Sequence, residues 1–562
     1  KKKFFFRKKQ PEIVQLPWDR PILPAAVDWL ISGEPEGVVD LSDSWVLLPT
    51  RQAGRRLREA LAWACNTRGG VFPPRTSTPF QLIRSAAPNV APEVICTWHW
   101  VQVLAGAKVE NCTALFPALP QKRDFAWCRK MACAMQDLRA TLMEGGWTCE
   151  SVYSSPHCEE ESARWRDLSF LEHEYTQLLD QNGLIDPHDA QIKASSELDV
   201  DNIRRIVLMG VTDAHRVIDQ VLEGLLEKGV KVQVVEFGPV EGFDEWGRPR
   251  PEFWAVRNLP LSNSEIFPAH DEQSQAETVV ARVKPYRKQV QDRVAVGVAD
   301  PAVLPQLERE FSDAGISAFN PDGQLLRHTS PFIFLKTLQS LLQNRSFTQA
   351  AAFLRLPDTW AWVAAGDERL TQTRLLAGLD ELHNKHLPAT LEDASRLNFE
   401  GERIANRIVA RDALRRLSAA LKRLMKLPIN HGLTEFLCEV FKHREFHEGN
   451  EADKSYLEIA RIFMDRLCEW ELVMDDAAAL EPADELGMLL DVVGEEAIFP
   501  ERSGDAVDIQ GWVELVWEDA PHLIIAGCNE GHLPKSIVGD RFLPEQLRER
   551  LGLTTNAERL AR

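Results

Sequence analysis

The chain of 562 residues is too long for one hydrophobic core, so we expect several domains. Its composition is that of an ordinary globular protein, and no apolar run approaches the roughly 20 residues that a transmembrane helix needs. The formal net charge of −19 argues against a protein that coats DNA with a uniformly basic surface, but it is compatible with a local basic channel. The apolar part of the N-terminal segment, Phe4 to Phe6, is too short for the core of a signal peptide, and we predict a soluble cytoplasmic protein with no membrane partner.

The ten cysteines are scattered along the chain without any C-x-x-C pair. The two closest are Cys128 and Cys133, and no second pair lies at the spacing of a zinc finger. We therefore expect reduced and mostly buried thiols, with no metal or iron–sulfur ligands among them.

The first α/β pattern is a short apolar strand near residues 45–48, followed by a helix from Gln52 to Ala64. Basic side chains crowd the start of this helix at Arg51, Arg55, Arg56 and Arg58. The helix dipole disfavours positive charge there, and a visiting phosphate would offset that cost. A solvated basic face explains the same residues without a ligand.

A second helix start follows at Thr78-Pro79, where proline suits the first helical turn. Residues 90–165 then have a helical pattern and indicate an inserted helical subdomain, and a further helix ends at Asn182-Gly183. Strand and helix patterns then alternate, with strands predicted at 205–210, 230–237, 293–298 and from Gly315, and helices predicted up to Leu226 and at 275–289, 302–314 and 330–342.

Residues 345–490 are predicted to be helical, and one helix in this stretch carries a basic stripe. Arg403, Arg407, Arg411 and Arg415 recur every four residues, which places them along one side of that helix. Two interpretations remain open: a solvated face paired with acidic neighbours, or a contact surface for nucleic acid.

The strand pattern returns after residue 489 and ends in the segment from Val507 to Leu553. Its apolar strand, His522 to Ala526, stops at Gly527 and is followed by the loop CNEGHLP. A loop at the carboxyl end of a strand is where open α/β sheets bind ligands.

Several catalytic motifs are missing from the sequence. It contains no G-x-x-x-x-G-K-[ST] loop, so it has no backbone cradle and lysine for a nucleoside triphosphate. The acidic pair Asp475-Asp476 lies in a helical context rather than after a strand. G-x-S-x-G and H-E-x-x-H are also absent, so we expect neither ATP hydrolysis nor serine or zinc hydrolase chemistry from this chain.

Several segments, taken in order, resemble the AddB/RexB-type subunit of bacterial helicase-nucleases, a group that includes RecC-like inactivated helicases. They are VLLPTRQAGRRLREAL (46–61), GLIDP (183–187), RIVLMGVTDAHRVIDQVLEGL (205–225), the stretch at 275–316, LLRHTSPFIFLKTLQSLL (325–342) and HLIIAGCNEGHLPKSIVGDRFLPEQLRERLGL (522–553). The resemblance covers nearly the whole chain, and its closing segment is the most specific part.

The resemblance implies an α/β fold with two RecA-like, superfamily-1 helicase-like domains, each carrying a helical insertion. We expect the first domain at 1–265 with its insertion at about 88–165. The second domain is expected at 266–344 and 490–562, around an insertion at 345–489.

The resemblance also implies a function in double-strand break repair. Such a subunit guides single-stranded DNA, some members scan it for a recombination hotspot, and the partner is a motor helicase-nuclease subunit of the AddA/RexA type. By position, Thr50, Arg51 and Thr78 match helicase motifs that touch the DNA backbone, and Gln510 begins the late coupling motif, although GWVEL departs from its usual pattern. The full set of predicted DNA-binding residues is Thr50, Arg51, Arg55, Thr78, Arg403, Arg407, Arg411 and Gln510.

Family members continue past the LGL segment into a Mg²⁺-dependent nuclease domain. We therefore expect the natural protein to extend beyond Arg562 as an exodeoxyribonuclease subunit, and we expect no cofactor, ATPase or nuclease activity within residues 1–562. Two alternatives remain: an active ATP-dependent helicase or nuclease, and a protein–protein scaffold with incidental DNA contact, for which the net charge of −19 is the best argument.

Overall fold

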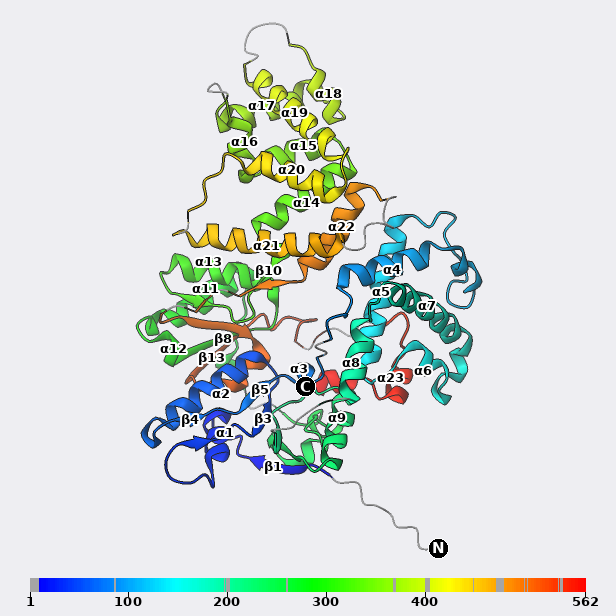
Figure 1. Cartoon of the computed structure of the whole chain (residues 1–562). Helices are drawn as coiled ribbons and strands as arrows, with labels where there is room; N and C mark the ends of the chain where they lie inside the picture. Colours follow the sequence, from blue (N-terminus) through cyan, green and yellow to red (C-terminus); the bar gives the residue numbers. More distant parts are fainter. Residues whose placement is uncertain are drawn as a thin grey trace.

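The computed structural model shows two parallel β-sheets, one above the other, with helices gathered at one end and along one side (Figure 1). The structure describes residues 10–84, 87–196, 198, 203–258, 261–366, 370–399, 405–447, 449–471, 480–499, 501–502, 504–533, 535 and 539–561. In this part of the chain no helix is long and apolar enough to cross a membrane.

The first sheet has the strand order β1-β7-β6-β3-β5, and every neighbouring pair is parallel. Its strands are β1 (Glu12–Leu16), β3 (Ser44–Leu47), β5 (Arg75–Ser77), β6 (Arg205–Met209) and β7 (Lys231–Phe237). Because successive side chains point to opposite faces, each buried strand supplies two cores. Helices α1 (Ile22–Ile31) and α2 (Arg51–Ala64) cover one face, and α9 (Arg216–Glu227) covers the other. We call this sheet and these helices the first unit.

The second sheet has the order β13-β8-β12-β9 and is also parallel throughout. Its strands are β8 (Val294–Val298), β9 (Ala318–Phe319), β12 (Val507–Gly511) and β13 (His522–Ala526). One face packs on α11 (Glu272–Val283) and α13 (Leu304–Asp313). Together these elements form the second unit, whose strands come from two segments far apart in the sequence.

Two predicted boundaries in the second unit are wrong. The helix predicted at 275–289 ends at Val283, because Pro285 cannot donate a backbone hydrogen bond and a 3-10 turn replaces the next helical turn. The strand predicted from Gly315 begins at Ala318, because Gly315 has φ +65° and ends α13, with the Ile316 amide donating back to the Phe311 carbonyl.

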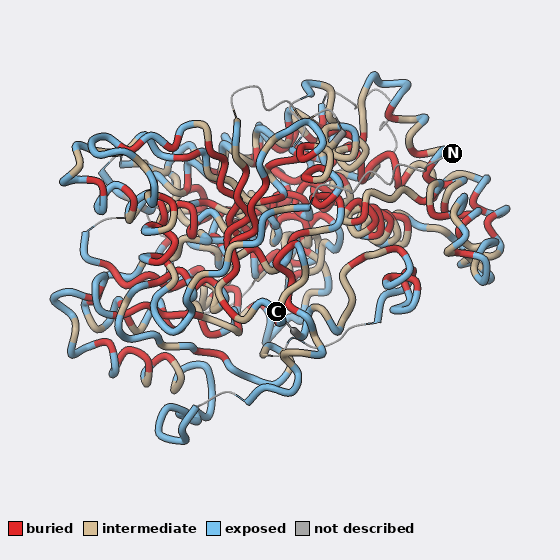
Figure 2. The backbone as a smooth tube through the Cα atoms, turned by 90° about the horizontal axis from the view of Figure 1, so that it is seen from below, coloured by how far each residue is buried: buried red, intermediate tan, exposed pale blue. Residues whose placement is uncertain are grey.

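Fourteen further helices of the described residues form one helical unit. Its members are α4 (Glu93–Ala105), α5 (Phe125–Met143), α6 (Cys149–Tyr153), α7 (Ser162–Gln181), α8 (Pro187–Ser196), α14 (Ser330–Gln343), α15 (Phe347–Leu354), α16 (Trp360–Ala364), α17 (Gln372–His386), α18 (Leu391–Arg396), α19 (Ala405–Leu424), α20 (Ile429–Phe441), α21 (Glu451–Glu471) and α22 (Pro482–Gly494). Both segments predicted to be helical contribute, and they share a continuous hydrophobic core. At their junction Trp98 of α4 meets Trp470 of α21 edge to face, with ring centroids 5.7 Å apart. Figure 2 shows buried residues running through the whole molecule.

A buried arginine joins four of these helices. The side chain of Arg139 on α5 is 4% exposed and forms ion pairs with Glu172, Asp186 (3.1 Å) and Asp189 (2.8 Å). The Tyr175 hydroxyl donates to Asp186 at 2.6 Å, and the backbone N–H groups of α6 donate to Glu172. This network fastens α5, α6, α7 and α8 to one another.

Helix α23 (Glu545–Leu551) and the residues just before it return to the same helices. The Trp147 indole donates to the Leu551 carbonyl at 2.9 Å, and Arg164 donates to the Phe542 carbonyl at 2.6 Å. Gly552 ends α23 with φ +67°, a conformation that favours glycine.

Candidate functional site

A short strap joins the two α/β units. It is the 3-10 segment Trp512–Trp517, which connects β12 to β13 and lies against the face of the second sheet that α11 and α13 leave free. Leu515 packs on β8, where a Cβ at Gly297 would approach the Leu515 side chain to 2.5 Å. Trp517 points the other way, into the core of the first unit beside Phe237, with ring centroids 6.0 Å apart. The strap therefore anchors one residue in each unit.

Ion pairs reinforce the contact between the units, and we call this contact the seam. Arg55 pairs with Asp508 of β12 at 3.3 Å, and Arg56 pairs with Glu518 at 2.7 Å and Asp519 at 2.8 Å. Two of the four arginines at the start of α2 are therefore neutralised by carboxylates across the seam. A helix start that looked unfavourable in isolation is stabilised by its tertiary neighbours.

Arg51 and Arg58 are the exposed members of the α2 arginine cluster. Arg58 donates to the Thr76 hydroxyl, whereas Arg51 has no ion pair or side-chain hydrogen bond among the described residues. Thr50 and Thr78 lie at the same edge, because they follow β3 and β5, which are parallel neighbours with Leu47 opposite Ser77. Both threonines are helix N-caps: Thr50 accepts from the Ala53 amide at 3.1 Å and Thr78 accepts from the Gln81 amide at 3.4 Å.

Gln510 lies inside the seam rather than at the surface. It is 2% exposed and its Nε2 donates to Glu518 at 3.1 Å. Glu514 of the strap is also buried. Its burial, and after that the neighbouring Asp322, raise the pKa of Glu514 to about 7, whereas a hydrogen bond from Thr50 lowers it. The seam is thus a buried acidic environment whose charges are only partly balanced.

The basic stripe on α19 is engaged within the helical unit. Arg407 pairs with Glu381 at 3.4 Å, Arg411 donates to Asp412 and to the Leu397 carbonyl, and both guanidinium groups lie over the Phe399 ring. Their side chains are only 13% and 15% exposed. Arg403 and the acidic pair Asp475-Asp476 lie outside the described residues.

The predicted DNA-binding residues therefore form two groups. Thr50, Arg51 and Thr78 share one edge of the first sheet, with Arg55 and Gln510 beside them in the seam. Arg407 and Arg411 lie on α19, at the far end of the helical unit (Figure 1). The tertiary structure does not bring the two groups together.

The loop after β13 holds the second unit together. Asn529 donates to Asp300 at 3.1 Å, and the Gly527 amide donates to Gln275 of α11 at 3.0 Å. Gly527 has φ +78°, and a Cβ there would come within 2.5 Å of the Asp300 amide nitrogen. This geometry joins the ends of β8 and β13 to α11. The described residues as a whole contain no cluster of three or more His, Cys, Asp or Glu side chains that could hold a metal ion.

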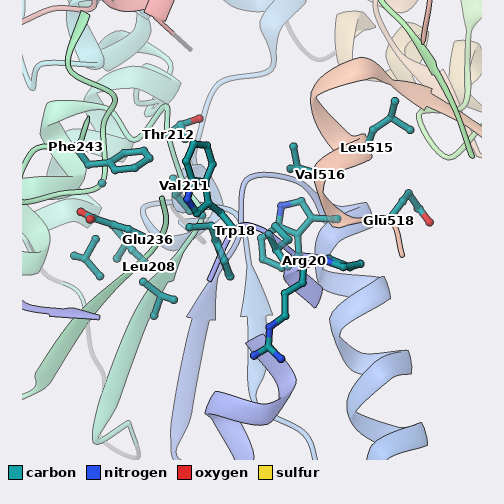
Figure 3. A pocket seen from close by; sticks show the side chains of 18 of the residues that line it. Trp18, Arg20, Leu208, Val211, Thr212, Glu236, Phe243, Leu515, Val516 and Glu518 are labelled. Atoms are coloured by element: carbon teal, nitrogen blue, oxygen red, sulfur yellow. The ribbon is translucent and has the colours of Figure 1, made fainter. Parts of the chain in front are cut away.

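A cavity of about 440 Å³ opens at the carboxyl ends of β1, β6 and β7. Figure 3 shows Leu208, Glu236 and Phe243 of the first unit on one side, and Leu515, Val516 and Glu518 on the other. This cavity was not predicted from the sequence, because β1 was not recognised as a strand. The alternation in Glu12–Leu16 is the signal that could have revealed it.

These features define an α/β protein of two parallel sheets, joined by a strap and flanked by a helical unit. Comparisons of the chain with protein-family models and with curated proteins find no match.

The buried Glu514 makes a pH-dependent contribution to stability that can be measured. The folded protein holds the Glu514 proton up to about pH 7, whereas an unfolded glutamate releases it near 4.5, so the folded state binds more protons in this window and loses stability as the pH rises. We expect Glu514→Gln to be more stable than the parent above pH 7 by about 2–3 kcal/mol, an advantage that disappears below pH 4.5.

Urea titrations at pH 5 and pH 8 measure this difference. Glu236 and Glu485, whose pKa values are also raised to about 7, are present in both proteins and cancel in the comparison. The exposed Glu549→Gln is the matched control and should show no pH-dependent difference. Equal pH dependence in the parent and in Glu514→Gln would contradict the assignment.

Proposed function

We propose that this chain is a non-motor, helicase-like DNA-binding subunit of a double-strand break repair helicase-nuclease. In this proposal the two α/β units are RecA-like domains, and the chain guides single-stranded DNA past a motor partner of the AddA/RexA type. The observation that carries the proposal is the shared edge of β3 and β5, where Thr50, Thr78 and the exposed Arg51 lie together. Those are the positions that the family resemblance assigns to DNA backbone contacts.

The turn between β1 and α1 supports a subunit that does not hydrolyse ATP. A phosphate loop joins a strand to a helix and presents successive backbone N–H groups to the phosphates. Residues 17–21 occupy that kind of turn with the sequence PWDRP. Two prolines remove two donors and no glycine is present, so the turn cannot wrap a triphosphate in the same way.

Arg51 supplies the sharpest test of DNA binding. We expect Arg51→Glu to weaken binding of labelled single-stranded DNA by about 5–30-fold at low salt, because a phosphate contact is replaced by repulsion. The slope of log affinity against log salt should fall by about 0.7 for each phosphate that the protein no longer neutralises. Fluorescence anisotropy at several salt concentrations measures both, with an ATPase assay on the same protein.

Arg309→Glu is the matched control, because Arg309 is 71% exposed on α13 and undergoes the same charge change. If both variants lose the same DNA affinity, the change in net charge explains the effect, and a DNA-binding site at Arg51 is contradicted. Measurable ATP hydrolysis would contradict the non-motor assignment.

A second set of variants addresses α19. Arg407 and Arg411 pack against Phe399 and Glu381, so reversing either charge should lower the melting temperature as well as any DNA affinity. Arg415 is 47% exposed on the same helix and reports on DNA contact with less structural cost. If Arg415→Glu binds DNA like the parent, the basic stripe acts in helix packing.

A protein–protein scaffold is the second candidate, and exposed apolar side chains favour it. Leu523 and Ile525 on the edge strand β13 are 50% and 45% exposed, and Val516 beside them is 56% exposed. Together with the net charge of −19, this surface suits a protein partner. Absence of DNA binding at low salt would favour the scaffold over the first proposal.

A further inference from the structure

The cavity at the carboxyl ends of β1, β6 and β7 has the composition of a small-molecule site. Its walls are mainly apolar and aromatic, with Trp18, Phe237, Phe243 and Trp517 among them. Trp18 is 53% exposed and lies at the opening, whereas Trp517 is 1% exposed. A concave apolar site with few polar groups is the usual form of a ligand pocket.

One buried acid provides the polar contact in this cavity. Glu236 is 3% exposed, and its Oε2 atom has no hydrogen-bond partner among the described residues. Buried carboxylate oxygens are nearly always paired, because an unpaired one has lost its bonds to water without gaining others. Burial, together with nearby Asp244, raises the pKa of Glu236 to about 7, and Arg250 opposes this rise. The wall of the cavity therefore contains a carboxylate oxygen that lacks a hydrogen-bond donor within the described part of the chain.

The charges around the cavity select the ligand. Of the lining residues, Glu236 and Glu518 are acids and Arg20 is the basic one. Glu518 is already paired with Arg56, so Glu236 is the acid left for a ligand, and it would repel a phosphate or carboxylate. Aromatic faces carry negative charge density and attract cations and the edges of polarised N–H groups. A flat aromatic ring with an amino group can pack against the aromatic walls and also donate a hydrogen bond to the acid.

We propose that this cavity binds a small flat heteroaromatic amine, with the ring against the aromatic side chains and its N–H groups donating to Glu236. This inference is independent of DNA binding, because the cavity lies toward the β1 edge of the first sheet, whereas Thr78 follows β5 at the other edge. Either proposal can fail without the other.

The test uses three bicyclic probes that differ only in their polar group: 2-aminoquinoline, quinoline and quinoline-2-carboxylate. Isothermal titration calorimetry on the whole chain at pH 7 should find that 2-aminoquinoline binds at least about tenfold more tightly than quinoline, through a charge-assisted hydrogen bond. Quinoline-2-carboxylate should show no binding. Equal affinities for the three probes would overturn the proposal.

Two variants assign the binding to this cavity. Glu236→Gln should weaken 2-aminoquinoline by at least about tenfold and leave quinoline within about twofold, whereas Glu227→Gln, on the exposed face of α9, should change neither. Val516→Trp adds bulk at an exposed position of the wall and should weaken both probes. If Glu236→Gln does not fold, Val516→Trp decides, and unchanged affinity there would overturn the proposal.

Discussion

Replacing Arg139 with methionine is expected to lower the free energy of unfolding by at least about 3–5 kcal/mol, the largest single effect that we predict. Methionine fills a similar volume but leaves Glu172, Asp186 and Asp189 without their shared cation. Their mutual repulsion is then unscreened in a buried site. Thermal and urea unfolding, followed by circular dichroism, measure the loss.

Two further variants separate the charge effect from lost packing. Arg166→Met is the matched control, because Arg166 is 59% exposed and its buried partner Asp167 keeps the amide donors of Ala114 and Leu115. It should change stability by less than about 1 kcal/mol. Adding Asp189→Asn to Arg139→Met should recover part of the loss, because one of the unpaired acids is removed. If the double variant is as unstable as the single one, packing rather than charge explains the effect.

Replacing Trp517 with alanine is expected to cost about 3–5 kcal/mol and to loosen the seam. The indole is 1% exposed and fills space between the strap and the first sheet, where it contacts Phe237. Its loss removes the apolar anchor of the strap in the first unit, leaving the arginine ion pairs of α2. Compared with the parent protein, the variant should therefore show a larger increase in amide hydrogen exchange in β12 and the strap than in the helical unit.

Trp63→Ala is the matched control for this prediction. Trp63 lies on α2 and is 87% exposed, so its truncation should change stability by no more than about 0.5 kcal/mol. A uniform increase in exchange across the chain, rather than one centred on the seam, would show that Trp517 supports global stability and not the joint between the units.

Local pattern predicted most of the regular structure. The strands β3, β6 and β8 are short apolar runs bounded by glycine, proline or polar residues, and buried parallel strands have this form in any context. The edge strand β13 has the same apolar pattern, although its side chains are mostly exposed. Strand β1 is weakly marked in the sequence, because its alternation covers only five residues between Pro11 and Pro17 and the strand is partly exposed at the sheet edge. It exists through pairing with β7, more than 200 residues later, and no local signal reports that pairing.

The candidate sites were predicted less completely than the strands. The position of Thr50 and Thr78 at strand ends follows from the sequence, because a threonine before a helix is a common N-cap. The partners of Arg55, Arg407 and Gln510 do not follow from it, since Asp508, Glu381 and Glu518 come from other elements of the fold. The same arginine can face solvent, DNA or a carboxylate, and only the neighbour decides.

The sequence by itself determined the alternation of α/β and helical segments, the absence of a phosphate loop and the basic start of α2. These properties depend on residue type and on periods of two to four residues along one segment. The tertiary structure alone decided that both helical segments share one core, that Arg55 and Arg56 are neutralised across the seam, and that Trp517 and Glu236 lie at one cavity. Each of those features joins residues far apart in the chain, and such contacts form through burial and charge pairing after the chain has folded back on itself.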